Sequence, residues 1–144
     1  MEKKKRELRS YFFRSVLLYF LADSVYLLFA FVLIFPMLLL GSVALAILTT
    51  AVYIVGVILG SAFIVKKTDN IFIYPAGAMV VELVYDLYET VKYTIEAFAE
   101  KESVFDVIKE YLHCLYGNLK TFAFLLALSA IIKYIFNRKK KEEE

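Results

Sequence analysis

The feature that most constrains this chain is an apolar run without a single charge, Ser42–Val65, which reads SVALAILTTAVYIVGVILGSAFIV. As a helix, ~20 apolar residues are long enough to cross the ~30 Å hydrocarbon core of a bilayer. A surface helix of a soluble protein would carry charged or polar side chains along one face. The run therefore predicts a membrane-spanning helix.

A second apolar run precedes it, Ser15–Leu40, with Asp23 as its one acid. Gly41 and Ser42 form the only plausible hinge between the two runs, so we expect a tight helical hairpin. Pro36 is expected to kink or end the first helix, because proline removes a backbone donor. The composition agrees with membrane helices: 61% of the 144 residues are hydrophobic and the mean hydropathy is +0.67, more than a soluble domain of this size can bury.

The N-terminus is basic, yet the apolar run that follows is too long for a signal-peptide core and no small-residue cleavage site follows it. We interpret it as a retained anchor. Cys114 is the single cysteine, which excludes a disulfide within the chain.

The rest of the chain predicts two further helices. From Pro75 onward, apolar side chains recur at helical spacing and acidic side chains line the opposite face. The last helix starts at Ser103, a good N-cap. Its second half, from Leu119, is a membrane-length apolar run with Lys120 near one end and Lys133 near the other.

The charge distribution indicates how many helices cross. Three basic clusters, at residues 3–14, 66–67 and 133–141, contain 13 of the 17 Lys and Arg residues. The positive-inside rule places such clusters on the cytoplasmic side. All three share one side only if the amphipathic third helix also crosses. We therefore expect four crossings, both termini in the cytoplasm, and the cell membrane as the location.

The expected fold is an all-α membrane bundle of four helices, roughly 11–40, 42–65, 75–101 and 103–136. It forms a single domain, 1–144, with basic N- and C-terminal tails. The third and fourth helices are expected to form a long antiparallel hairpin. Because the fourth helix, at ~50 Å, is longer than the bilayer is thick, residues 91–116 are expected to stand outside the membrane as a polar hairpin.

Four ionisable residues fall at membrane depth in this arrangement: Asp23, Glu82, Asp86 and Lys120. Charged groups in a membrane are energetically costly and indicate an ion or proton path by default. The alternative is that they only fix helix packing. Antiparallel register predicts that Glu82 pairs with Lys120. Similar pairing is expected for Lys92 with Glu110 and Glu96 with Lys109, and His113 is expected level with Glu89 to Val91.

Glu110 and His113 have the E-x-x-H spacing of four-helix di-iron proteins, and Asp106 lies one turn before Glu110. These three residues are a weak metal candidate, because half of the usual ligand set is missing from one chain. A homodimer could supply the second half. The alternative is a solvated polar helix face, so no metal or other cofactor is expected.

Gly56 and Gly60 form a G-x-x-x-G motif in the uncharged run. Small residues at this spacing let helix backbones approach closely in lipid. Packing within the chain is the simpler interpretation, and contact with another copy is the alternative.

No phosphate-binding loop, dinucleotide fingerprint, nucleophile elbow or HExxH motif occurs. We therefore expect a non-enzymatic structural or accessory membrane component acting through helix contacts, with the bilayer and a homo-oligomer or membrane complex as partners. The alternatives are a small oligomeric transporter or ion-conducting protein, and a membrane metal-binding protein. No nucleic-acid partner is expected, since the basic residues flank spans and no reader motif accompanies them.

Overall fold

The computed structural model describes residues 2–40, 42–99 and 103–142. These residues form four helices: α1 (Glu2–Leu40), α2 (Ser42–Thr68), α3 (Ile73–Ala99) and α4 (Val104–Glu142). No strand occurs in the described ranges. The predicted all-α fold of four helices is confirmed.

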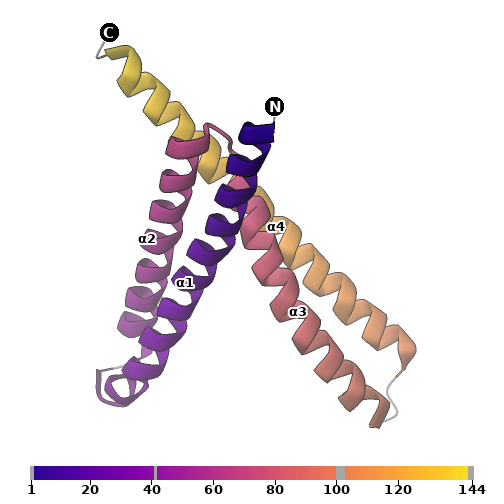
Figure 1. The fold of residues 1–144 in the computed structure, drawn as a ribbon. Coiled ribbons are helices and arrows are strands. Elements are labelled where there is room, and N and C mark those ends of the chain that lie inside the picture. Colours follow the sequence, from indigo (N-terminus) through magenta and orange to yellow (C-terminus); the bar gives the residue numbers. More distant parts are fainter. Residues whose placement is uncertain (1, 41, 100–102, 143–144) are drawn as a thin grey trace.

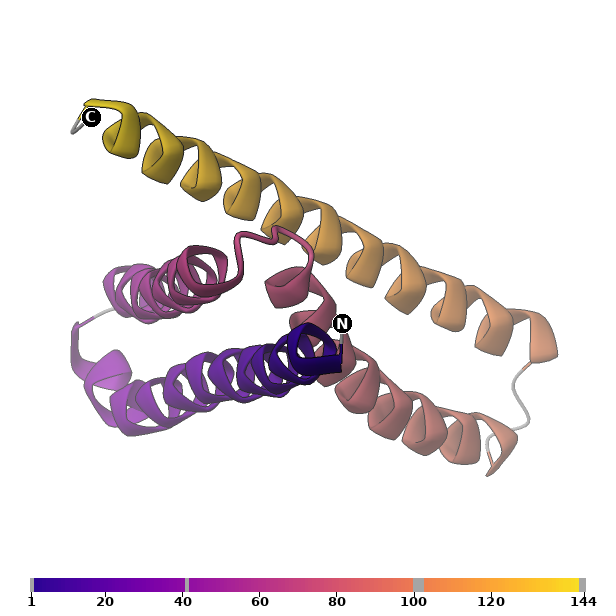
Figure 2. The same ribbon diagram turned by 45° about the horizontal axis from the view of Figure 1, so that its top comes forward.

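The helix ends differ from expectation mainly in the basic tails, which are helical. α1 begins at Glu2 rather than near residue 11, and α4 continues to Glu142 rather than ending near residue 136. An ion pair one turn apart, Arg138 Nε to Glu142 Oε1 at 2.9 Å, supports the last turns of α4. α1 does not end at Pro36, and its last turns bend away from the main axis (Figure 2).

The helices are arranged as two antiparallel hairpins, α1 with α2 and α3 with α4, which meet at one end and diverge toward the other (Figure 1). The predicted α3–α4 hairpin is thus present. Both ends of the described chain and the α2–α3 connection lie at the end where the hairpins meet. The last turns of α1 and α3 and the first turns of α2 and α4 lie at the diverging ends (Figure 1). This is the arrangement that an even number of crossings requires.

The α2–α3 connection is a short ordered turn. Asp69 adopts a left-handed backbone, with φ 53°, and its N–H donates to Val65 O at 2.8 Å. The side chain of Asn70 then accepts a hydrogen bond from the Phe72 N–H at 2.8 Å, and Pro75 lies in the first turn of α3, where proline is tolerated. Lys133 on α4 reaches this turn, with Nζ 3.0 Å from Asp69 Oδ1.

α1 and α3 cross at a close contact just below this turn. Ser15 Oγ donates to Ile73 O at 3.0 Å, and both residues are buried. Gly77 faces Ser15 so closely that a Cβ on Gly77 would lie 2.0 Å from the serine oxygen. The absence of a side chain at Gly77 therefore determines how near the two helices can approach.

Three helical segments are long and apolar enough to cross a membrane: Arg6–Val32, Ala46–Thr68 and Val104–Glu142. These segments support a membrane location. α3 is not among them, because acidic side chains interrupt its apolar sequence.

The first half of α3 nevertheless has the inside-out pattern of a membrane helix. Its outward face carries large apolar side chains, with Val84 62% exposed and Leu87 66% exposed. Glu82 and Asp86 instead lie half-buried between helices. Polar groups turned inward and apolar groups turned outward are what a lipid environment favours.

Candidate functional site

The polar interior of the molecule is built around Glu82 on α3. The hydroxyl of Tyr19 on α1 donates to Glu82 Oε1. Tyr19 also shares a hydrogen bond with Tyr53 on α2, with 2.7 Å between the two hydroxyl oxygens. Tyr19 is buried and packs edge-on against Tyr53 and Tyr74. The Glu82 carboxyl group on α3 is thereby connected to α1 through Tyr19 and to α2 through Tyr53.

The two other acids in this region also contact neighbouring helices. Asp23 on α1 lies against the Tyr85 hydroxyl of α3, which is placed to donate to it. Asp86 on α3 accepts a hydrogen bond from the side-chain amide of Asn118 on α4, and Asn118 is buried. We call the three acids and the four uncharged side chains that connect them the tyrosine–carboxyl cluster. Its members are Tyr19, Asp23, Tyr53, Glu82, Tyr85, Asp86 and Asn118.

Glu82 and Asp86 lie well below the α2–α3 turn. Along α3, Glu82 is ~14 Å and Asp86 ~20 Å from Ile73, at 1.5 Å per residue. That these two acids lie at membrane depth stays a prediction.

The predicted pairing of Glu82 with Lys120 is wrong. Within the described residues, ion pairs at 4 Å or less join Lys133 to Asp69 and Arg138 to Glu142. The Lys120 ammonium instead lies over the Tyr116 ring, 4.1 Å from its centre. Counting residues along two antiparallel helices predicted how far along α4 Lys120 lies, but not which side of α4 its side chain occupies. At that position along the helix, Asn118 is the side chain that is directed inward.

The other predicted ion pairs between α3 and α4 are also absent. Lys92, Glu96, Lys109 and Glu110 are all exposed, and none has a carboxylate or ammonium partner within 4 Å in the described chain. The hairpin is held there by Thr94 and Tyr111, whose hydroxyl oxygens lie 3.3 Å apart. Exposed flexible charges gain little from fixed pairing in a polar solvent.

The fold does not assemble the metal candidate into a ligand group within the described residues. Asp106, Glu110 and His113 lie exposed on the first half of α4. The described residues contain no group of three or more acidic, histidine or cysteine side chains placed to hold a metal ion. A site completed by a second chain stays a prediction.

Both glycines of the G-x-x-x-G motif pack within the chain. A Cβ on Gly56 would lie 3.1 Å from the Cβ of Ala22 on α1. A Cβ on Gly60 would lie 2.8 Å from the hydroxyl oxygen of Tyr74, which is buried. The small face of α2 is thus used for contacts with α1 and α3.

Sequence reasoning missed the uncharged members of the cluster. A signal was present in α1, where Ser15, Tyr19 and Asp23 follow one another at four-residue spacing and form a polar stripe in an apolar helix. Ser61 on α2 and Ser129 on α4 were also missed. They are fully buried and joined by a hydrogen bond of 2.8 Å, which ties the two hairpins together.

Comparisons with protein-family models, with curated protein sequences and with solved structures give no match. The class of the protein therefore rests on its own features. Three helices long and apolar enough to cross a membrane, together with an inward-facing polar cluster, are compatible with a helical membrane protein. A biochemical role has to be argued from the cluster itself.

Proposed function

We propose that this chain is a non-enzymatic, multi-pass component of the cell membrane that acts through helix contacts. One observation carries the proposal: each acid of the tyrosine–carboxyl cluster is engaged by a hydroxyl or amide from a different helix. The three contacts join α3 to α1 twice and to α4 once. A group used in this way fixes helix position, which is the role expected of polar side chains between membrane helices.

The acids of the cluster do not line the hollows described on the molecule. None of the four hollows includes Asp23, Glu82 or Asp86, and Tyr53 is the cluster member that lines the one between α2 and α4. Ligand sites in proteins are concave and admit a few convergent polar groups. The proposed partners are therefore lipid, a second copy of the chain or another membrane protein. The proposed orientation has both termini in the cytoplasm.

The test compares Glu82→Gln combined with Asp86→Asn against Glu89→Gln, an exposed acid on the same helix. The amides keep an oxygen that accepts the existing hydrogen bonds but remove ionisation. For a structural role, the double variant keeps the wild-type oligomeric state and melting temperature in detergent. It also shows the same proton flux in liposomes as wild type, namely none above empty vesicles.

A second candidate, proton or cation conduction, is favoured by one specific observation. Within the described chain, no Lys or Arg lies within 4 Å of Glu82, Asp86 or Asp23, and hydroxyl groups connect Glu82 through Tyr19 to Tyr53. Ionisable groups at membrane depth indicate an ion or proton path by default. Flux in wild type that the double variant abolishes, while Glu89→Gln retains it, would replace the structural proposal with this one.

A further inference from the structure

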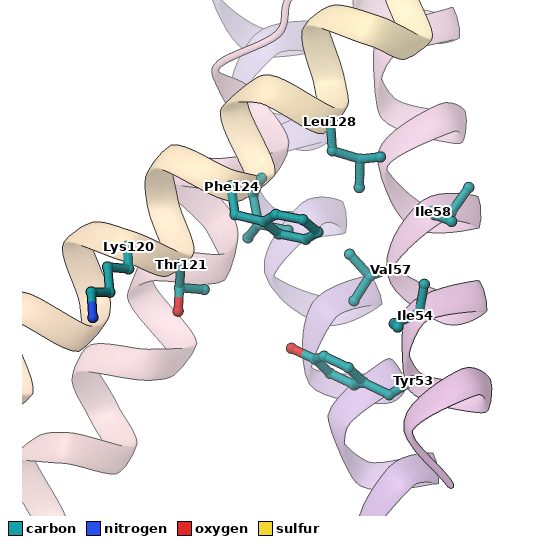
Figure 3. A pocket seen from close by; sticks show the side chains of 9 residues that line it. Tyr53, Ile54, Val57, Ile58, Lys120, Thr121, Phe124 and Leu128 are labelled. Carbon is teal, nitrogen blue, oxygen red and sulfur yellow. The ribbon is translucent and has the colours of Figure 1, made fainter. Parts of the chain in front are cut away.

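The diverging hairpins leave a groove between α2 and α4, on the side of the molecule away from α1. Its volume is about 340 Å³. Figure 3 shows Phe124 of α4 directed across it toward α2, with Val57 and Ile58 on the facing helix. Apart from Lys120, Thr121 and Tyr53, the lining is aliphatic or aromatic: Ile54, Val57, Ile58, Phe124, Leu125 and Leu128.

The groove has a charged end and an apolar end. Lys120 lies at one end and Leu128 at the other, with Phe124 between them (Figure 3). From position 120 to position 128 the helix rises ~12 Å. One leaflet of a bilayer contributes about half of ~30 Å of hydrocarbon. The groove is therefore no longer than one leaflet is thick.

Lys120 supplies a cation without an internal anion. It lies ~20 Å along α4 from Lys133, which marks the level of the α2–α3 turn. No carboxylate in the described part of the chain lies within 4 Å of its ammonium group. The contact with the Tyr116 ring is electrostatic but leaves the positive charge uncompensated. A lysine at this depth is stabilised by an anion or by reaching toward the headgroups.

From the shape and the charge together, we infer that this groove is a binding site for an anionic membrane phospholipid. One acyl chain lies against Phe124 and Leu128, and the phosphate is held at Lys120. The lipid comes from the leaflet opposite the termini, because Lys120 is nearer than Lys133 to the start of α4, which lies at the diverging ends of the hairpins (Figure 1). Basic residues beside apolar clefts between membrane helices are suited to such headgroups. This inference does not depend on the role of the tyrosine–carboxyl cluster.

The chain contains no tryptophan, so a single introduced tryptophan reports on the groove alone. The experiment uses Phe124→Trp in bilayers of phosphatidylcholine and phosphatidylglycerol, with brominated chains on one lipid or the other as quencher. Ala123→Trp, at the same depth on an exposed part of α4, reports ordinary surrounding lipid. We expect brominated phosphatidylglycerol to quench Phe124→Trp at about fivefold lower mole fraction than brominated phosphatidylcholine, and Ala123→Trp to show no such preference.

Two charge variants on the Phe124→Trp background complete the test. Lys120→Gln should abolish the preference, whereas Lys92→Gln, which removes an exposed cation from α3, should retain it. Equal quenching by the two lipids overturns the inference, as does a preference that Lys120→Gln leaves intact. Absence of quenching by either lipid also overturns it, because protein or a second copy would then cover the groove. Native mass spectrometry of the tryptophan-free wild type and Lys120→Gln checks retained phospholipid independently of the reporter.

Discussion

At the residue scale, contacts in this protein depend on small side chains at helix crossings and on tyrosine hydroxyls between helices. Gly77 and Ser15 set the α1–α3 distance, and Tyr19 connects the carboxyl group of Glu82 with α2. These contacts differ in how much stability is lost when a side-chain group is removed or added. A hydroxyl that already has partners is costly to remove, whereas one without a partner is not.

The first prediction concerns Gly77→Ala. The added methyl would meet the Ser15 oxygen at 2.0 Å and a backbone nitrogen at 2.9 Å, so the helices must separate. Overpacking of this kind costs ~1–3 kcal/mol. We expect a lower melting temperature by circular dichroism in detergent. Gly117→Ala is the matched control, because no atom lies within 4 Å of a Cβ there, and it should match or exceed wild type, since alanine favours a helix. Equal effects of the two changes would contradict the close α1–α3 crossing at Gly77.

The second prediction compares two buried tyrosines. Tyr19→Phe removes the hydroxyl that donates to Glu82 and leaves that carboxyl group without its partner, at a cost of ~1–3 kcal/mol. Tyr74→Phe removes a buried hydroxyl that finds no hydrogen-bond partner in the described chain, so its melting temperature should equal or exceed that of wild type. The same thermal unfolding assay measures both. A loss of stability for Tyr74→Phe as large as that for Tyr19→Phe would show that the pairing at Glu82 contributes nothing specific.

At the element scale, the sequence was sufficient to predict which segments form helices, but only in part which side chains of each helix are directed inward. Hydrophobic run length identified α1, α2 and the second half of α4, because crossing a bilayer requires a fixed number of apolar residues. The inward turn of Glu82 and Asp86 followed from the cost of charge in lipid. Their partners did not follow, because height along a helix fixes level but not rotation, and neutral Tyr19 and Asn118 are cheaper to bury than a lysine.

The third prediction tests whether α3 crosses. Lys101, the natural position for a reporter, lies outside the described residues, so we choose Glu96→Cys, which is exposed near the end of α3. In a background with Cys114→Ser, a membrane-impermeant maleimide should label Glu96→Cys from the side opposite to Lys139→Cys. The reason is that four crossings leave the α3–α4 connection on the side away from both termini. Labelling of both positions from the same side would mean that α3 lies on the membrane rather than through it.

At the scale of the whole molecule, the two hairpins are joined mainly near one end. The Ser61–Ser129 hydrogen bond and the Lys133–Asp69 ion pair lie toward that end, whereas the other ends of the two hairpins diverge (Figure 1). Because the inferred lipid groove exists only while the hairpins diverge, the hairpin angle connects the fold with the binding site.

The last prediction measures this divergence by disulfide formation, again with Cys114→Ser. Ser61→Cys with Ser129→Cys should form an intrachain disulfide on mild oxidation, because the native side-chain oxygens lie 2.8 Å apart, and sulfur atoms in their place need to approach to only ~2.05 Å to bond. Ile47→Cys with Leu115→Cys places cysteines on the same two helices toward their diverging ends, where both side chains are exposed, and should remain reduced. Crosslinking is read from the mobility shift on nonreducing gels and confirmed by mass spectrometry. Efficient oxidation of both pairs would mean that α2 and α4 lie parallel along their length in the bilayer, which would close the groove and remove the basis for a lipid site.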